Sequence, residues 1–99
     1  MTSTSGANKA LDANAARKRI SSILRGGQLK LTRHAREELA QDELTEVDVV
    51  SVLRGGHITE PAEEVNGTWR YRVHTNLIWV VVAFRSETEL VVVTVWRKR

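Results

Sequence analysis

The C-terminal third of the chain alternates apolar and polar residues with the period of a β-strand. Between residues 68 and 74, the apolar positions are Trp69, Tyr71 and Val73, and the polar positions are Thr68, Arg70, Arg72 and His74. Successive side chains of a strand point to opposite faces, so this pattern predicts one apolar face and one cationic face. Two further apolar runs, residues 77–84 and 90–96, follow after short polar breaks. Three such strands in succession predict an antiparallel meander with the run 77–84 at its centre.

The N-terminal half has the periodicity of α-helices instead. Apolar residues recur at spacings near 3.6 within residues 11–25, which predicts an amphipathic helix. Thr32 is the expected N-cap of a second helix over residues 33–41. Thr45 is the expected N-cap of a third helix, with Asp48 placed to complete a capping box.

Glycine and proline mark the boundaries of these elements. Gly-Gly pairs at residues 26–27 and 55–56 are expected to end the first and third helices in the left-handed conformation. Residues 28–31 are predicted to form a short strand or an extended link. Residues 57–60 are predicted to form a strand, and Pro61 implies an edge position or the end of that strand.

The resulting order is a helix, a short strand, two helices and then four strands. Asn66 and Gly67 supply a tight turn directly before the meander. We therefore predict an α+β fold in which N-terminal helices pack on one face of a four-stranded, mainly antiparallel sheet. Residues 1–8 are small and polar, which predicts a disordered N-terminus, and residues 9–99 are long enough for a single domain.

Composition excludes several kinds of site. The chain contains no cysteine, so disulfides, thiolate metal sites and cysteine nucleophiles are excluded. Its three histidines lie on different predicted elements without a carboxylate cluster, so we expect no metal and no cofactor. The longest uncharged apolar run is far below the ~20 residues that a membrane helix needs. The N-terminus lacks the apolar segment of a secretory signal, so we expect a cytoplasmic protein with no membrane partner.

Charge is distributed unevenly along the chain. Residues 1–36 carry eight basic residues and one acid, residues 37–64 carry nine acids and one base, and residues 65–99 carry six bases and two acids. Basic ends on a polarised molecule indicate an anionic partner, and simple solvation of helix faces is the alternative.

The strongest candidate site is the row Arg70, Arg72 and His74 on one face of a predicted strand. Arginine binds phosphate oxygens and stabilises the charge that develops on them, and histidine transfers protons near neutral pH. RNA supplies its own 2′-hydroxyl nucleophile, so such a row could cleave RNA without a metal. Alternatively, the row is a solvated sheet face that pairs with Glu87 or Glu89 on a neighbouring strand.

Other residues could contribute to the same chemistry. His34 lies in the first turn of the second helix, with Glu38 one turn later, and is either a second proton-transfer group or a structural residue. Trp96 follows Thr94 on the last strand beside a basic tail and is the best candidate for stacking on a base. We expect core positions for three further aromatic side chains, Trp69, Tyr71 and Trp79.

Three segments resemble the DUF4258 family of small bacterial proteins. Thr32-Arg33-His34-Ala35 resembles its "(S/T)-x-His-Ala" helix start, and Gly67 with Tyr71-Arg72-Val73 resembles its "Gly…Tyr-Arg-Val" strand. Thr94-Val95-Trp96-Arg97 resembles its "Thr-Val-(Tyr/Trp)-Arg" ending. Relatives commonly carry an Arg-Gly pair where this chain has Asp42-Glu43.

The resemblance implies a fold of the barnase–EndoU–colicin–RelE type, many of whose members are metal-independent ribonucleases that serve as toxins. It also implies site positions, and these are His34, Arg36, Arg72, Thr94 and Arg97.

Two function hypotheses follow from these residues. The first is a toxin-like ribonuclease that cleaves RNA by 2′-hydroxyl attack and is neutralised by a cognate antitoxin. His34 or His74 would transfer the proton, while Arg72, Arg97 and Arg36 would stabilise phosphate. The second is a non-catalytic module that uses the cationic sheet face, including Arg70, Thr94 and Trp96, to bind RNA or a protein partner. The acidic segment 37–64, docking a basic partner, is a further alternative.

Overall fold

The computed structural model describes residues 9–98, which form three helices and five strands. The helices are α2 (Ala13–Gly26), α3 (Arg33–Gln41) and α4 (Glu46–Gly55). The strands are β1 (Gln28–Leu31), β2 (Glu63–Val65), β3 (Thr68–His74), β4 (Ile78–Phe84) and β5 (Glu89–Arg97). The segment 1–8, which we expected to be disordered, lies outside the described residues. No helix within the described part of the chain combines the length and the apolar character needed to cross a membrane.

Side-chain caps begin each helix. The carboxylate of Asp12 accepts a hydrogen bond from the backbone N–H three residues later at 2.8 Å, and Thr32 does the same for α3 at 3.0 Å. Thr45 and Asp48 form a reciprocal capping box at the start of α4. The predicted caps at Thr32 and Thr45 are confirmed, and each satisfies backbone N–H groups that have no partner inside the helix.

The sheet has the strand order β1-β5-β4-β3-β2 and is mainly antiparallel. Only the pair β1–β5 is parallel, with Leu29 opposite Leu90. The prediction of four strands is therefore wrong, because the short segment 28–31 joins the sheet as an edge strand. Its partner lies far along the sequence, so no local pattern indicated the pairing.

The predicted strand at residues 57–60 is also wrong. Only His57 pairs with β3, through an isolated bridge to His74, and the regular strand β2 begins later, at Glu63. Proline has no N–H to donate to a ladder, so Pro61 interrupts this edge between the bridge and β2.

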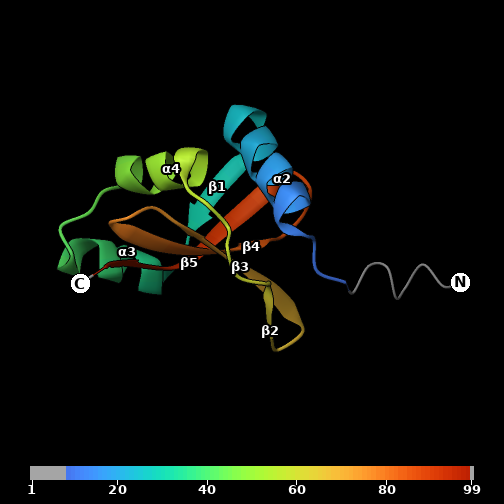
Figure 1. Ribbon diagram of the computed structural model, residues 1–99. Coiled ribbons are helices and arrows are strands. Elements are labelled where there is room, and N and C mark those ends of the chain that lie inside the picture. Colours follow the sequence, from blue (N-terminus) through green and yellow to red (C-terminus); the bar gives the residue numbers. More distant parts are fainter. Residues whose placement is uncertain (1–8, 99) are drawn as a thin grey trace, which may run out of the picture.

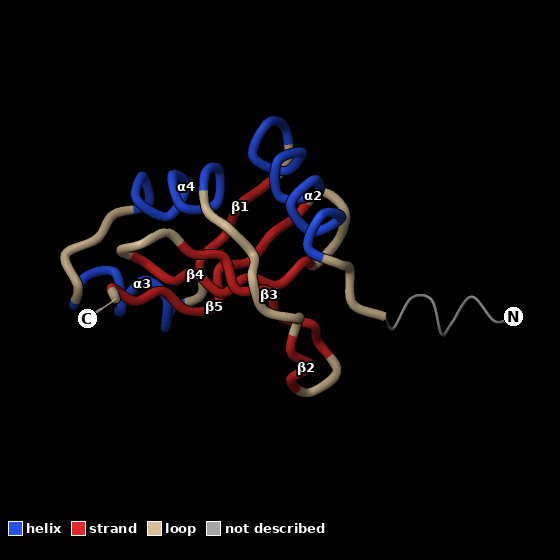
Figure 2. The backbone as a smooth tube through the Cα atoms, viewed as in Figure 1, coloured by secondary structure: helices blue, strands red, loops and turns tan. Residues whose placement is uncertain are grey.

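The core lies between one face of the sheet and the helices. Figures 1 and 2 show α2 and α4 over the same side of the sheet, and α3 beside β5. The N–H of Thr32 donates to the carbonyl of Val92 at 3.0 Å, so α3 starts where β1 ends and runs on along β5. Fully buried side chains from helices and sheet meet in this core, among them Ala16, Ile20, Ala35, Val49, Val73, Val80, Val82, Leu90, Val92 and Val95. The predicted one-sided helical layer holds for α2 and α4, whereas α3 lies along the sheet edge.

The second glycine of each Gly-Gly pair is needed for close packing and not for a left-handed turn. Gly27 has φ −101° and Gly56 has φ −80°, so the left-handed conformation expected there is wrong. A Cβ on Gly56 would lie 2.8 Å from the carbonyl oxygen of His74. A Cβ on Gly27 would clash with the carbonyl oxygen of Thr88. Left-handed glycine occurs instead at Gly67 (φ 81°), in the predicted turn between β2 and β3.

Candidate functional site

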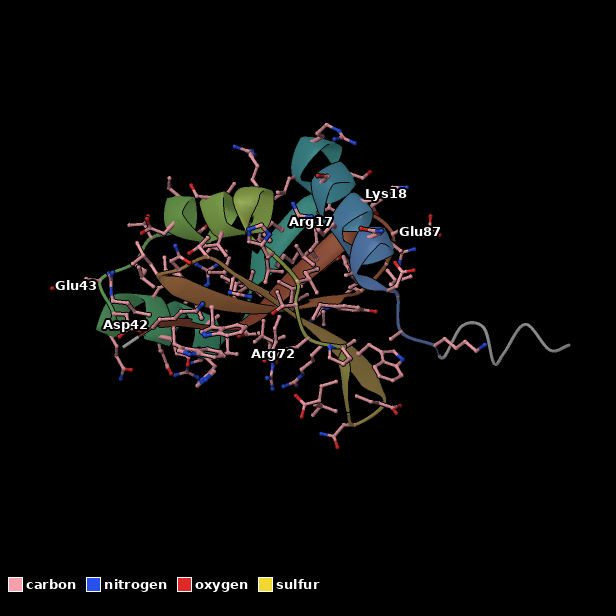
Figure 3. All side chains as sticks on the ribbon, in the orientation of Figure 1. Arg17, Lys18, Asp42, Glu43, Arg72 and Glu87 are labelled. Atoms are coloured by element: carbon pink, nitrogen blue, oxygen red, sulfur yellow. The ribbon has the colours of Figure 1, made fainter. Side chains whose placement is uncertain are left out.

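The predicted cationic row lies on the side of β3, β4 and β5 opposite α2 and α4. Figure 3 shows Arg72 pointing away from those two helices. The strand register places Arg72, Val81 and Thr94 side by side, and places His74 beside Trp79 and Trp96. We call this surface the outer face, and its functional candidates are Arg70, Arg72, His74, Trp79, Thr94 and Trp96.

Aromatic rings form a stacked row across the outer face. The ring centroids of His74 and Trp79 are 4.3 Å apart, and those of Trp79 and Trp96 are 5.9 Å apart. The Nζ atom of Lys98 lies 4.7 Å from the centroid of the Trp79 ring, within the range of a cation–π interaction. Trp96 is 36% exposed, so the row ends in an accessible indole ring. Trp79 belongs to this row and not to the core, which corrects the prediction.

Hydrogen bonds orient the imidazole of His74. Its Nε2 atom lies 3.0 Å from the Thr59 hydroxyl, and its Nδ1 atom lies 3.0 Å from Nζ of Lys98. An ammonium group can only donate, so Nδ1 accepts, and a neutral ring then carries its proton on Nε2, facing Thr59.

A second histidine lies directly beside His74. His57 and His74 exchange two backbone hydrogen bonds, of 2.8 and 3.0 Å. Residues opposite each other in an antiparallel pair project their side chains to the same face, so His57 also belongs to the outer face. The sequence pattern does not indicate His57 or Lys98, because neither residue lies in the alternating segment 68–74 that predicts the row.

The arginines of the row differ in their surroundings. The guanidinium of Arg72 pairs with Glu60 at 2.8 Å and with Glu63 at 3.1 Å. These acidic partners come from the segment that precedes β3, and not from Glu87 or Glu89 as the alternative reading expected. The Nε atom of Arg70 is buried without a hydrogen-bond partner. The charge of Arg72 is therefore compensated by two carboxylates, and the Nε atom of Arg70 is shielded from solvent.

The remaining predicted site residues lie elsewhere. His34 is exposed on α3 and pairs with Glu38 at 3.3 Å, as the structural alternative predicted. Arg36 pairs with Glu46 at 3.5 Å, and the guanidinium of Arg97 donates to the Asp42 carbonyl at 2.9 Å. The structure thus brings together Arg70, Arg72, His74, Thr94 and Trp96, and it separates Arg36 and Arg97 from them.

His34 reaches the outer face only indirectly. The carboxylate of Glu38 that pairs with His34 also accepts a hydrogen bond from the hydroxyl of Thr94. Among the described residues, no hydrogen bond or ion pair joins His34 to His74. The two histidines that the sequence proposed as alternatives are consequently parts of different clusters.

Two carboxylates, that of Glu38 in α3 and that of its C-cap Asp42, cover the edge of β5 beyond the end of β1. Glu38 accepts a hydrogen bond from the N–H of Val95 at 3.0 Å, and Asp42 accepts one from the N–H of Arg97 at 2.9 Å. These side chains take the place that a neighbouring strand would occupy, and they satisfy N–H groups that an open edge would expose.

Metal-binding side chains are not clustered in the described part of the chain. Within residues 9–98, no group of three or more histidine, aspartate or glutamate side chains could hold a metal ion. The site therefore consists of aromatic rings, cations, two histidines and hydroxyl groups.

Fold and site define an α+β protein with an open five-stranded sheet whose uncovered face carries stacked aromatic rings flanked by cations. Residues 31–97 match the family described as a domain of unknown function (DUF4258), and the chain belongs to this family. Helix α2 and most of β1 precede the matched region. No curated protein and no solved structure matches the chain.

Proposed function

We propose that this protein binds single-stranded RNA on the outer face. The stacked row of His74, Trp79 and Trp96 beside Lys98 is the observation that carries the proposal. Bases stack on aromatic side chains with about 1–3 kcal/mol per base, and nearby cations attract the phosphate backbone. The exposed indole of Trp96 at the end of the row and the lysine over the central Trp79 ring supply these two interactions.

Arg72 adds a further cation, for which the phosphate backbone of RNA can compete with the two carboxylates that pair with it. Its partners Glu60 and Glu63 are surface carboxylates, with 46% and 59% of their side chains exposed. Exposed ion pairs contribute little stability, so a phosphate oxygen can replace one of these carboxylates at the guanidinium. Binding of this kind weakens as salt concentration rises.

The replacement Trp96→Ala tests this proposal. We expect it to weaken binding of a labelled 12-nucleotide RNA by about tenfold or more, because one base loses its stacking partner. Fluorescence anisotropy at constant salt measures the affinity, and Trp96→Phe is the matched variant that keeps an aromatic ring. Equal affinities for the wild type, Trp96→Ala and Trp96→Phe would contradict the proposal.

Metal-independent RNA cleavage is a second candidate function, favoured by the neighbouring side chains of His57 and His74. One histidine would take the proton of a 2′-hydroxyl while its oxygen attacks phosphorus. The P–O5′ bond then breaks, and the other histidine protonates the leaving 5′ oxygen. The products are a 2′,3′-cyclic phosphate and a free 5′-hydroxyl, and Arg72 would stabilise the charge on phosphate.

A toxin role belongs to this second candidate. The resemblance to RelE-type toxins suggested it, and such a toxin would be neutralised by a cognate antitoxin. His34, held by Glu38 next to Thr94, is the alternative proton-transfer group.

Incubation with total RNA and with ribosomes in EDTA tests for cleavage. We expect His74→Ala to lower the cleavage rate by about 100-fold or more, since general acid–base catalysis contributes 10²–10⁴-fold. His57→Ala and His34→Ala, with folding checked by circular dichroism, identify the second proton-transfer group. If the wild type leaves both RNA and ribosomes intact, the protein is a binding module and not a nuclease.

A further inference from the structure

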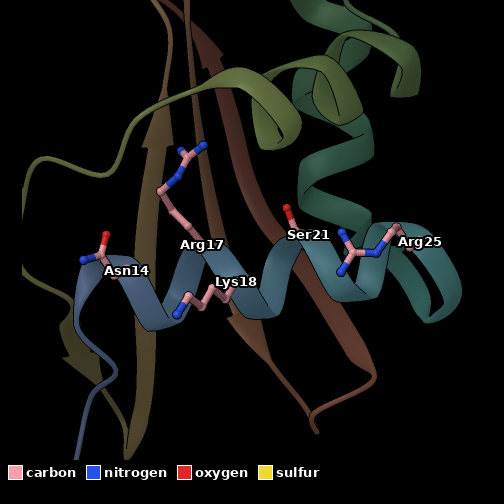
Figure 4. Close-up of a pocket in the computed structure, with 5 residues that line it drawn as sticks. All are labelled: Asn14, Arg17, Lys18, Ser21 and Arg25. Atoms are coloured by element: carbon pink, nitrogen blue, oxygen red, sulfur yellow. The ribbon is translucent and has the colours of Figure 1, made fainter.

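The solvent-facing side of α2 forms a polar hollow of about 570 Å³. Figure 4 shows the residues that line it: Asn14, Arg17, Lys18, Ser21 and Arg25. Each of these residues lies three or four positions from another of them, so they follow one stripe along the helix. We call this surface the α2 stripe. It lies on the opposite side of the sheet from the outer face, because the inward side of α2 packs into the core.

The cations of the α2 stripe form no ion pair with any acidic residue that the structure describes. Within residues 9–98, the lysine and arginine side chains that pair with a carboxylate are Lys30, Arg33, Arg36 and Arg72. Arg17 donates instead to the carbonyl of Gly56, the C-cap of α4, which fixes its guanidinium between the two helices. Lys18 and Arg25 are exposed. A fixed guanidinium and two free cations therefore concentrate uncompensated positive charge along this helix.

The side chains that line the hollow also indicate which kind of anion can bind there. Among the described residues, no apolar side chain lines the hollow, whereas protein interfaces depend on buried apolar and aromatic anchors. No aromatic ring lines it either, and single-stranded nucleic acids bind largely through stacking of their bases. A purely polar, cationic stripe suits the phosphate backbone of a duplex, whose bases are already stacked.

We propose that the α2 stripe binds the phosphate backbone of double-stranded RNA. Lys18 and Arg25 lie about 10 Å apart along the helix axis, since each residue of a helix rises 1.5 Å. The stripe can therefore contact more than one phosphate of the same strand. The inference rests on the proposed function in taking RNA as the ligand, but it assigns a second, sequence-independent contact on the other side of the domain. One protein would then hold a duplex on α2 and a single strand on the outer face.

The double variant Lys18→Gln/Arg25→Gln tests this inference. Both side chains are exposed and form no ion pair with another described residue, so the fold is expected to persist. The matched control Arg33→Gln/Arg54→Gln removes the same charge from exposed positions on α3 and α4. The probes are a 16-base-pair RNA duplex and a 12-nucleotide single strand, each measured over a range of salt concentrations.

We expect the stripe variant to bind the duplex about tenfold more weakly, with the slope of log affinity against log salt reduced by about two. Single-strand binding and the control variant should change little. Duplex affinity and salt slope that equal those of the control would overturn the inference. Preferential binding of poly-glutamate by the stripe would also overturn it, in favour of an acidic protein partner.

The two proposals fail in different ways. This inference alone would be wrong if Trp96→Ala weakened the affinity for single-stranded RNA while Lys18→Gln/Arg25→Gln left the affinity for the duplex unchanged. The proposed function alone would be wrong if Lys18→Gln/Arg25→Gln weakened the affinity for the duplex while Trp96→Ala left the affinity for single-stranded RNA unchanged.

Discussion

Replacing Gly56 with alanine is expected to lower the free energy of unfolding by about 2–4 kcal/mol. The added Cβ would lie 2.8 Å from the carbonyl oxygen of His74, 2.5 Å from that of Val52 and 3.1 Å from Cγ1 of Val73. Two of these neighbours are backbone atoms, held by the end of α4 and by β3. Relief of the clash must therefore separate the helix end from the strand, and urea denaturation measures the cost.

Gly55→Ala provides the matched control, one residue earlier in the chain. A Cβ on Gly55 meets nothing within 4 Å, and Gly55 is the last residue of α4. Alanine at this position is expected to be neutral or to stabilise the protein by up to about 1 kcal/mol, because glycine is a poor helix former. Equal stabilities for the two variants would show that the helix end can move away from β3 without cost.

The displacement at Gly56 would also reach the outer face. His57 follows Gly56 directly and pairs with His74 by two backbone hydrogen bonds. A shift of the helix end would move His57 relative to His74. If the protein cleaves RNA, we therefore expect the cleavage rate per amount of folded protein to be lower in Gly56→Ala than in the wild type.

Glu38→Ala is expected to destabilise the protein by about 2–3 kcal/mol. The change leaves the N–H of Val95 and the hydroxyl of Thr94 without their acceptor, and a buried donor that loses its partner costs about 1–3 kcal/mol. Val95 is fully buried, so water has little access to its N–H group. Thermal or urea unfolding measures the loss.

The neighbouring Glu37→Ala serves as its control. The side chain of Glu37 is 64% exposed and pairs with that of Arg33, which is 93% exposed. Exposed pairs of this type contribute little, so we expect a change below about 0.5 kcal/mol. A small effect at Glu38 would mean that water enters and replaces the carboxylate at the edge of β5.

Glu38 and Asp42 also explain how the protein closes one edge of its sheet. Edge strands with free N–H groups are templates for pairing with other chains. Covering β5 with two carboxylates leaves less of that edge open, and we expect Glu38→Ala to associate more readily at high concentration. The same arrangement holds Arg97 away from the outer face.

The chemistry at residues 42 and 43 illustrates a departure from the family pattern. The family pattern that the sequence resembles commonly has an Arg-Gly pair there, and Glu43 has the positive φ of 56° that glycine adopts without strain. Asp42 uses both its carboxylate and its carbonyl to bind Arg97. Asp42 thus holds Arg97, a site position that the family resemblance implied, in a contact within the fold.

The sequence by itself determined the elements that depend on neighbours a few residues apart. It predicted α3 over residues 33–41, the caps at Thr32 and Thr45, and the turn at Gly67. It also predicted the split of residues 68–74 into an apolar and a cationic face. Capping bonds, helical periodicity and strand alternation all arise within a few residues of one another, so the sequence expresses them directly.

Only the tertiary structure decided which distant residues share a surface. It paired β1 with β5, placed His57 and Lys98 beside His74, and turned Arg97 towards α3. It also required glycine at position 56 because a strand passes close to the helix end. Each of these contacts depends on the register between segments far apart in the chain, and a one-residue shift of that register would exchange the two faces of a strand.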